Sequence, residues 1–99
     1  MYPRNTYMSP KAIVNPDELR IFAQKLNQFN KEMAQNMSAL QSQFVRLGDT
    51  WQDQEHQKFA REFEQTMRVL SQFQRTSEQQ IPSLLKKARI IDDYLHSGT

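Results

Sequence analysis

A short break divides the sequence into two long stretches whose apolar residues recur with a helical period. The break covers residues 47–53 and reads Leu-Gly-Asp-Thr-Trp-Gln-Asp. Gly48 can end a helix because glycine adopts the left-handed conformation without steric cost. Asp49 and Thr50 both suit the N-cap of a following helix, and Gln52 has capping-box spacing from Asp49. We therefore predict a turn at 48–50, and a connection this short forces the two helices to run antiparallel.

The stretch before the break opens with a helix start signal. Asn15 suits the N-cap, Pro16 suits the first helical position, and two carboxylates follow in the first turn. The apolar residues then recur in eight steps that cover 28 residues, a mean of 3.5; they are Leu19, Phe22, Leu26, Phe29, Met33, Met37, Leu40, Phe44 and Leu47. This spacing predicts a helix over residues 16–47 with a coiled-coil-like seam along one side.

The stretch after the break has a second seam. Its ten steps cover 36 residues, a mean of 3.6, through Phe59, Phe63, Met67, Leu70, Phe73, Ser77, Ile81, Leu84, Ala88, Ile91 and Leu95. We predict a helix from about residue 51 to about 96, and an interior proline such as Pro82 usually kinks a helix at a cost of about 3 kcal/mol. A separate helix that starts at Pro82 is the alternative, but Ile81 would be a poor N-cap.

A register argument adds an expectation about the C-terminal part. Counted from the turn, residues 82–95 overhang the start of the first helix, yet they carry several leucines and isoleucines. Because burying such a side chain contributes about 1.5–3 kcal/mol, we expect a partner chain, or Ile13 and Val14, to cover them.

Composition limits the class of protein. The 99 residues suit one small domain, and residues 1–15, with two prolines and no helical period, predict an irregular or disordered arm. A net charge of +2 from 13 basic and 11 acidic residues gives no reason to expect nucleic acid. The sequence has no cysteine, which excludes disulfides and thiolate metal sites. No apolar run predicts stable membrane insertion and no signal-peptide core is present, so export would need a route without a cleavable leader.

The two seams hold more aromatic surface than one contact between two helices encloses. We therefore predict an all-α fold in which the antiparallel two-helix hairpin pairs into a four-helix bundle dimer. The partner is either an identical copy, giving a homodimer, or a related hairpin protein, giving a heterodimer. The predicted partner-binding residues are Trp51, Phe22, Phe29, Phe44, Phe59, Phe63, Met67 and Leu70.

This hairpin with a tryptophan in its turn resembles the WXG family, the ESAT-like small proteins of type VII secretion. Trp51-Gln52-Asp53 occupies the place of the family's Trp-X-Gly turn, so that Gly48, Trp51 and Asp53 form the turn motif, with Asp53 in place of the family glycine. Phe59 and Phe63 follow the tryptophan by eight and twelve residues, as in that family.

The C-terminal export signal of that family, a tyrosine followed four residues later by an acidic residue, is not met. Tyr94 is followed at that distance by Gly98, so Tyr94 would belong to a degenerate export tail.

The resemblance implies a non-enzymatic interaction protein, a substrate or co-substrate of a type VII (ESX-like) secretion system that acts as a dimer. Such a protein is cytoplasmic before export, needs no cofactor, and has a type VII secretion ATPase as a further partner. The alternative is a cytoplasmic helical adaptor or chaperone module that is not exported. Trp51 would either belong to a recognition surface or plug the end of the bundle.

The sequence contains no motif typical of a catalytic or metal site. It lacks a Ser-His-acid set and a glycine-rich phosphate loop, which argues against an enzyme. His56 and His96 have no second histidine at a metal-binding spacing, so we interpret both as surface residues.

Overall fold

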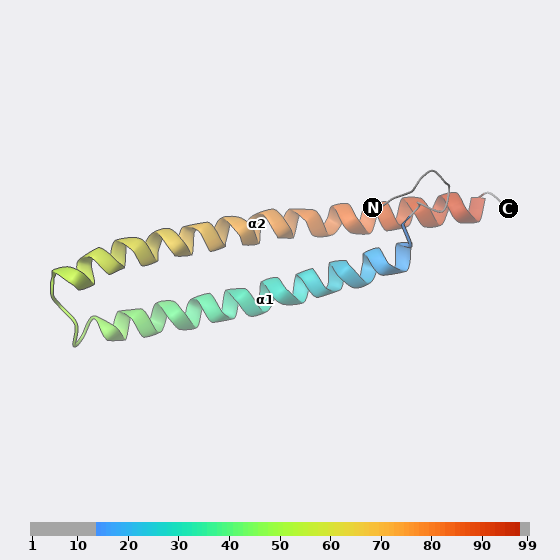
Figure 1. The fold of residues 1–99 in the computed structure, drawn as a ribbon. Coiled ribbons are helices and arrows are strands. Elements are labelled where there is room, and N and C mark those ends of the chain that lie inside the picture. Colours follow the sequence, from blue (N-terminus) through green and yellow to red (C-terminus); the bar gives the residue numbers. More distant parts are fainter. Residues whose placement is uncertain (1–13, 98–99) are drawn as a thin grey trace, which may run out of the picture.

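The computed structural model describes residues 14–97, which form two long helices and the connection between them (Figure 1). Helix α1 spans Pro16–Leu47 and helix α2 spans Gln54–Ser97. They lie side by side and run in opposite directions, which confirms the all-α antiparallel hairpin. The molecule measures 69 × 29 × 14 Å, and α2 alone accounts for the length because 44 helical residues span about 66 Å. The predicted N-terminal arm lies outside the described residues except for Val14 and Asn15.

The start of α1 is capped as the sequence predicts. Asn15 has an extended backbone, and its Oδ1 accepts hydrogen bonds from the amides of Asp17 at 2.8 Å and Glu18 at 3.4 Å. Pro16 occupies the first turn, where its missing N–H leaves no hydrogen bond unmade. This cap therefore fixes the first residue of the hairpin.

The end of α1 differs from the expectation for Gly48. Its φ of −64° and ψ of −17° are right-handed, so the predicted left-handed termination is wrong. The amides of Asp49, Thr50 and Trp51 still bond back to carbonyls of the last turn, at 3.0–3.2 Å. What Gly48 contributes is space, because a Cβ there would lie 3.2 Å from the carbonyl oxygen of Val45.

The connection is longer than predicted, since α2 begins at Gln54 and not near residue 51. Its N-cap is Asp53, whose Oδ1 accepts the amide of His56 at 3.0 Å. Asp49 and Thr50 cannot cap α2 because their backbones continue the hydrogen bonding of α1. Gln52 donates from Nε2 to the carbonyl oxygen of Gly48 at 3.2 Å, which braces the turn.

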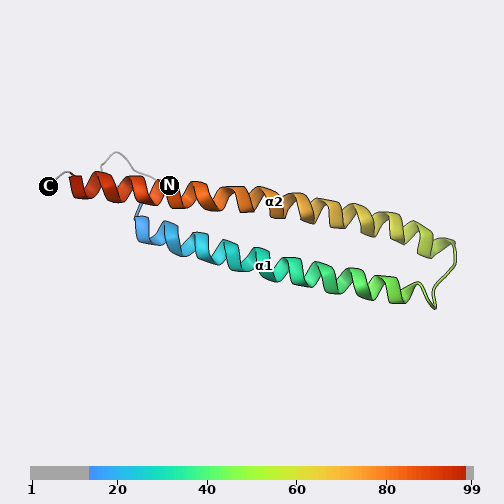
Figure 2. The same cartoon turned by 180° about the vertical axis from the view of Figure 1, so that it is seen from behind.

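Helix α2 passes through Pro82 as one continuous helix, in agreement with the preferred interpretation over a separate helix. The proline does not produce the expected sharp kink, and both ribbon views show only gentle curvature in this part of α2 (Figures 1 and 2). Pro82 and Glu78 are both exposed, so water can satisfy the Glu78 carbonyl that loses its amide partner. The helix therefore tolerates the proline on its solvent side.

The overhang is shorter than the sequence argument predicts. Arg20, in the second turn of α1, pairs with Asp92, and Ala88 has no exposed surface. The segment from Pro82 to Ala88 therefore lies alongside α1, and the C-terminal end of α2 extends past the start of α1 (Figure 2). The longer connection and later start of α2 account for the shift in register.

The core between the helices is thin. The buried apolar residues of the described chain are Ala23, Met37, Met67 and Ala88, and no large side chain in it is fully buried. Two polar residues, Asn30 and Ser77, share this narrow seam, each 2% exposed. A single hairpin therefore leaves most of its apolar surface in contact with water.

We expect Pro82→Ala to stabilise the helix, because alanine restores the missing hydrogen bond and an interior proline costs about 3 kcal/mol. Urea denaturation followed by circular dichroism, at one protein concentration, should give a higher free energy of unfolding. The neighbouring exposed variant Ser83→Ala is the control and should change it by less than about 0.5 kcal/mol. An unchanged or lower stability of Pro82→Ala would contradict this account of the helix.

Candidate partner-binding surface

The tip of the hairpin is closed by an aromatic cluster. The ring of Trp51 lies edge-on to His56 with centroids 5.1 Å apart, and 6.0 Å from Phe59. His56 in turn stacks on Phe44 at 5.2 Å with an interplanar angle of 6°. Trp51 is half-buried, so it plugs the tip and still presents part of its indole to solvent.

The interpretation of His56 as a surface residue is wrong. The ring lies between Phe44 and Trp51, and its Nε2 is buried with no hydrogen-bond partner. His56 stands three residues after the N-cap Asp53, where a helical side chain leans back over the preceding turn. That position was the one sequence signal for its role.

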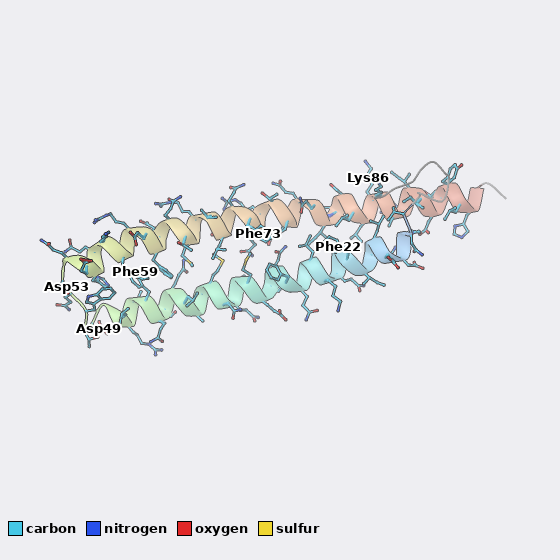
Figure 3. The ribbon with its side chains drawn as sticks, viewed as in Figure 1. Phe22, Asp49, Asp53, Phe59, Phe73 and Lys86 are labelled. Atoms are coloured by element: carbon cyan, nitrogen blue, oxygen red, sulfur yellow. The ribbon has the colours of Figure 1, made fainter. Side chains whose placement is uncertain are left out.

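One side of the hairpin, which we call the apolar face, gathers half-exposed apolar side chains from both helices. Its members are between 41% and 56% exposed: Phe22, Phe29, Leu40 and Leu47 of α1, with Phe59 and Phe73 of α2. Phe29 and Phe73 meet edge to face at 6.1 Å. Figure 3 shows Phe22, Phe59 and Phe73 on the sides of their helices that adjoin the other helix.

Two shallow grooves continue the apolar face along the hairpin. One is lined by Leu40 and Leu47 of α1 together with Phe59 of α2. The other is lined by Phe22 together with Leu84 and Lys87 of α2. The apolar face therefore extends over most of the length of α1.

The opposite side, which we call the polar face, has a different character. Its middle groove is lined mainly by polar and charged side chains, among them Gln41, Glu64, Arg68 and Arg75, whereas the grooves toward the two ends also contain apolar side chains. The exposed large apolar residues in these grooves are Val45, 72% exposed, and Leu85, 39% exposed, and they lie far apart along the hairpin. A large contiguous apolar patch marks an interaction surface whereas scattered residues do not, so the apolar face is the candidate site.

The predicted site residues fall into two groups. Phe22, Phe29 and Phe59 lie on the apolar face and are available to a partner. Phe44, Phe63 and Leu70 are half-buried in the seam, where Phe44 and Phe63 pack at 4.9 Å. Met67 is only 6% exposed and lies inside the hairpin. Tyr94 is 68% exposed near the end of α2.

A polar pair inside the seam was not predicted as a functional feature. The Oγ of Ser77 lies 2.9 Å from Oδ1 of Asn30 and 3.1 Å from the Phe73 carbonyl oxygen. The Nδ2 of Asn30 is buried without a partner. A polar pair at one level of an apolar seam favours one alignment of two helices over shifted ones. The presence of Ser77 in the apolar repeat was the available signal.

The open end of the hairpin is held by an ion pair. The guanidinium of Arg20 bonds to the carboxylate of Asp92 and, at 3.2 Å, to that of Asp17. The hydrogen bond to Asp92 is the main reason why the pKa of Arg20 lies above its ordinary value. Arg20 therefore stays charged, and the pair joins α1 to the last part of α2.

The described part of the chain was also searched for metal sites and membrane-spanning helices. Residues 14–97 contain no group of three His, Asp or Glu side chains placed to hold a metal ion. Neither α1 nor α2, as far as they are described, combines the length and apolar character required to cross a membrane.

The described chain is thus a small all-α protein, a slender helical hairpin with a tryptophan at its tip and one apolar face. A family model, WXG100, described as proteins of 100 residues with WXG, matches residues 12–89. The chain therefore belongs to the WXG100 family. The comparisons with curated proteins and with solved structures gave no match.

We expect Asp53→Ala to lower the free energy of unfolding by about 1 kcal/mol, since it removes the N-cap of α2. Asp49→Ala is the matched control, because Asp49 is exposed and its carboxylate makes no hydrogen bond. Thermal denaturation of both variants at one concentration checks the assignment. A larger loss of unfolding free energy for Asp49→Ala than for Asp53→Ala would show that Asp49 is the N-cap of α2, as the sequence alone predicted.

We expect Ser77→Ala to destabilise the hairpin by about 1–3 kcal/mol, because both polar atoms of the Asn30 side chain then lie buried without partners. The double variant Asn30→Leu with Ser77→Ala removes the polar pair altogether and should recover that loss. Urea denaturation of the two variants gives the comparison. Equal stability of both would show that the Asn30–Ser77 contact contributes nothing.

Proposed function

We propose that this protein is a non-enzymatic substrate or co-substrate of a type VII (ESX-like) secretion system and acts as a dimer. The observation that carries the proposal is the WXG100 match over residues 12–89, which includes α1, the Trp51 turn and α2 as far as Arg89. The hairpin fold and the aromatic tip agree with it. In this proposal the protein is cytoplasmic before export and leaves the cell without a cleavable signal peptide.

The apolar face supports the dimer in this proposal. The seam buries only four apolar residues of the described chain, while Phe22, Phe29 and Phe73 remain about half exposed. Covering one such side chain contributes roughly 1.5–3 kcal/mol, so a second hairpin against this face would add a substantial part of the total stability. The partner-binding residues are Phe22, Phe29 and Phe59, with Phe44, Phe63, Met67 and Leu70 as the layer beneath them.

The tip supports a second contact, with a type VII secretion ATPase. Trp51 is held by His56 and Phe59 and still exposes part of its indole, so it is a preorganised apolar group at the end of a rod. Asp53 stands where the family motif has glycine, and its N-cap role maintains the turn. Gly48 completes this turn motif, since a Cβ there would lie only 3.2 Å from the carbonyl oxygen of Val45.

One observation favours a second candidate function, a cytoplasmic adaptor or chaperone module that is not exported. Tyr94 is followed four residues later by Gly98, and not by an acidic residue. A hairpin with an incomplete tail would be exported only together with a partner, or would stay in the cell and use the same apolar face there.

The proposal predicts that the protein accumulates in the culture medium of a strain with an intact secretion ATPase and not in a strain that lacks it. Immunoblots of medium and lysate, with a cytoplasmic protein as the lysis control, provide the measurement.

A Gly98→Glu variant separates the two candidates, because it completes the spacing after Tyr94. If the tail alone limits export, this variant should raise the amount in the medium several-fold, whereas Gly98→Gln should not. Protein found only in lysates of both strains, for the natural chain and for Gly98→Glu, would reject the export proposal in favour of the adaptor.

A further inference from the structure

We propose that the polar face carries a second docking surface, near the tip, for a single amphipathic helix with acidic residues seven positions apart. This helix belongs to a different protein, and its binding is additional to the pairing and export proposed above. Because the surface lies opposite the apolar face, a hairpin whose apolar face is covered can still bind the helix. The surface consists of two adjoining grooves with an apolar floor and a row of arginines along one rim.

The two grooves form one continuous depression, which we call the tip groove. Gln41, Glu64 and Met67 line both of them, so the grooves share a border. Together they follow α2 from Ala60 to Arg75, a distance of about 22 Å at 1.5 Å per residue. This length suits a partner helix of about four turns.

The floor of the tip groove is apolar at the end nearer the turn. Phe44, Phe63 and Met67 supply it, and the Met67 side chain is only 6% exposed. Val45 lies at its edge and is 72% exposed, more than any other large apolar residue of the described chain. A flexible thioether beside two aromatic rings adapts to the shape of a partner side chain, and Val45 adds apolar surface to be covered. This end of the groove therefore suits an apolar anchor of the partner helix.

The rim formed by α2 carries three arginines at a constant spacing. Arg61, Arg68 and Arg75 follow one another at intervals of seven residues, or about 10.5 Å. The only acidic side chain that lines the tip groove is Glu64, which pairs with Arg68 at 3.6 Å. Both side chains of this pair are more than 60% exposed, so the pair is weak. Neither Arg61 nor Arg75 forms an ion pair with another described residue.

Glutamines hold two of these arginines in position. The Nε of Arg68 donates to Oε1 of Gln65 at 3.4 Å, and an Nη2 hydrogen of Arg75 is donated to Oε1 of Gln72 at 2.9 Å. A neutral amide orients a guanidinium group without cancelling its charge. Arg20 at the open end provides the contrast, since two carboxylates compensate its charge. The arginine row is therefore oriented and mostly uncompensated, which favours an acidic partner.

The spacing of the arginines favours a helix over an extended segment as the partner. On a helix, residues seven positions apart return to the same side after about 10.5 Å, which equals the arginine spacing. On a strand, residues of one side recur after about 6.6 or 13 Å, so their carboxylates would fall out of step with the arginines. A helix with a carboxylate at every seventh position therefore reaches Arg61, Arg68 and Arg75 together, while its apolar stripe covers the floor.

A synthetic peptide tests this docking surface on the purified chain. The probe is a fluorescently labelled, end-capped peptide of nineteen residues, built from alanine and glutamine, with two leucines in each heptad and three glutamates seven positions apart. We expect binding in the micromolar range by fluorescence anisotropy, with an affinity that falls as salt is added. The matched peptide with glutamines in place of the three glutamates should bind about tenfold more weakly, because three exposed ion pairs are lost.

Two matched pairs of variants locate the peptide on the tip groove. Arg75→Gln should weaken binding about threefold to fivefold, whereas Arg89→Gln should leave it unchanged. Arg89 is the control because it is exposed, follows Arg75 by two heptads and lines neither groove. Val45→Asp should weaken binding on the order of tenfold, whereas Val69→Asp, at another valine that is 57% exposed, should not. Circular dichroism checks that all four variants keep their helices.

Three outcomes would overturn the proposal. The first is equal affinity of the glutamate and glutamine peptides, or no binding of either at concentrations up to about 1 mM. The second is a single-stranded oligonucleotide that binds more tightly than the peptide and is weakened by Arg75→Gln, which would make the arginine row a site for polyanions. The third is a Val45→Asp variant that weakens the dimer in sedimentation equilibrium as much as Leu40→Lys on the apolar face. Peptide binding is measured on purified protein and export in culture medium, so each proposal can fail separately.

Discussion

Two helices that lie side by side share a single line of contact, and every other feature of this hairpin follows from that constraint. The line is narrow, so it is filled where the helices come closest by small or flexible side chains, Ala23, Met37, Met67 and Ala88. Phe44 and Phe63 enter the seam only near the tip, and the other phenylalanines lie along one edge, where they form the apolar face. Because the two helices lie close together, the seam between them is tightly packed, and the phenylalanines of the apolar face are only half covered.

At the tip, the pair of helices has no neighbouring element to cover its apolar end, and residues of the turn and the start of α2 provide this cover. Trp51 and His56 supply the cover, because Asp53 starts α2 late enough for His56 to lean back over the turn onto Phe44. Asp53 in the WXG100 turn is thus compatible with the hairpin. It lacks the conformational freedom of glycine, but its side chain supplies the N-cap of α2. The tip becomes a rigid end that still presents part of an indole.

The sequence alone was enough to predict the two helices, but it was not enough to predict the contacts between them. Strong local signals, such as the Asn15 cap and the apolar periods, specified α1 and the antiparallel hairpin. The turn was mispredicted because Asp49, Thr50 and Asp53 are equally good caps in isolation, and the hydrogen bonds that continue from α1 decide between them. His56 and the Asn30–Ser77 pair could not be identified because their roles depend on which residues of the other helix lie opposite. The predicted overhang failed for the same reason, since three extra residues in the connection shift the whole alignment.

The distance along the chain between contacting residues grows steadily from the tip to the open end. Phe44 and Phe59 are fifteen residues apart, Asn30 and Ser77 forty-seven, and Arg20 and Asp92 seventy-two. Closing a short loop costs less entropy than closing a long one, so the hairpin should fold like a zipper that starts at the aromatic tip. The ends held by Arg20 and Asp92 are then the last to join and the first to fray.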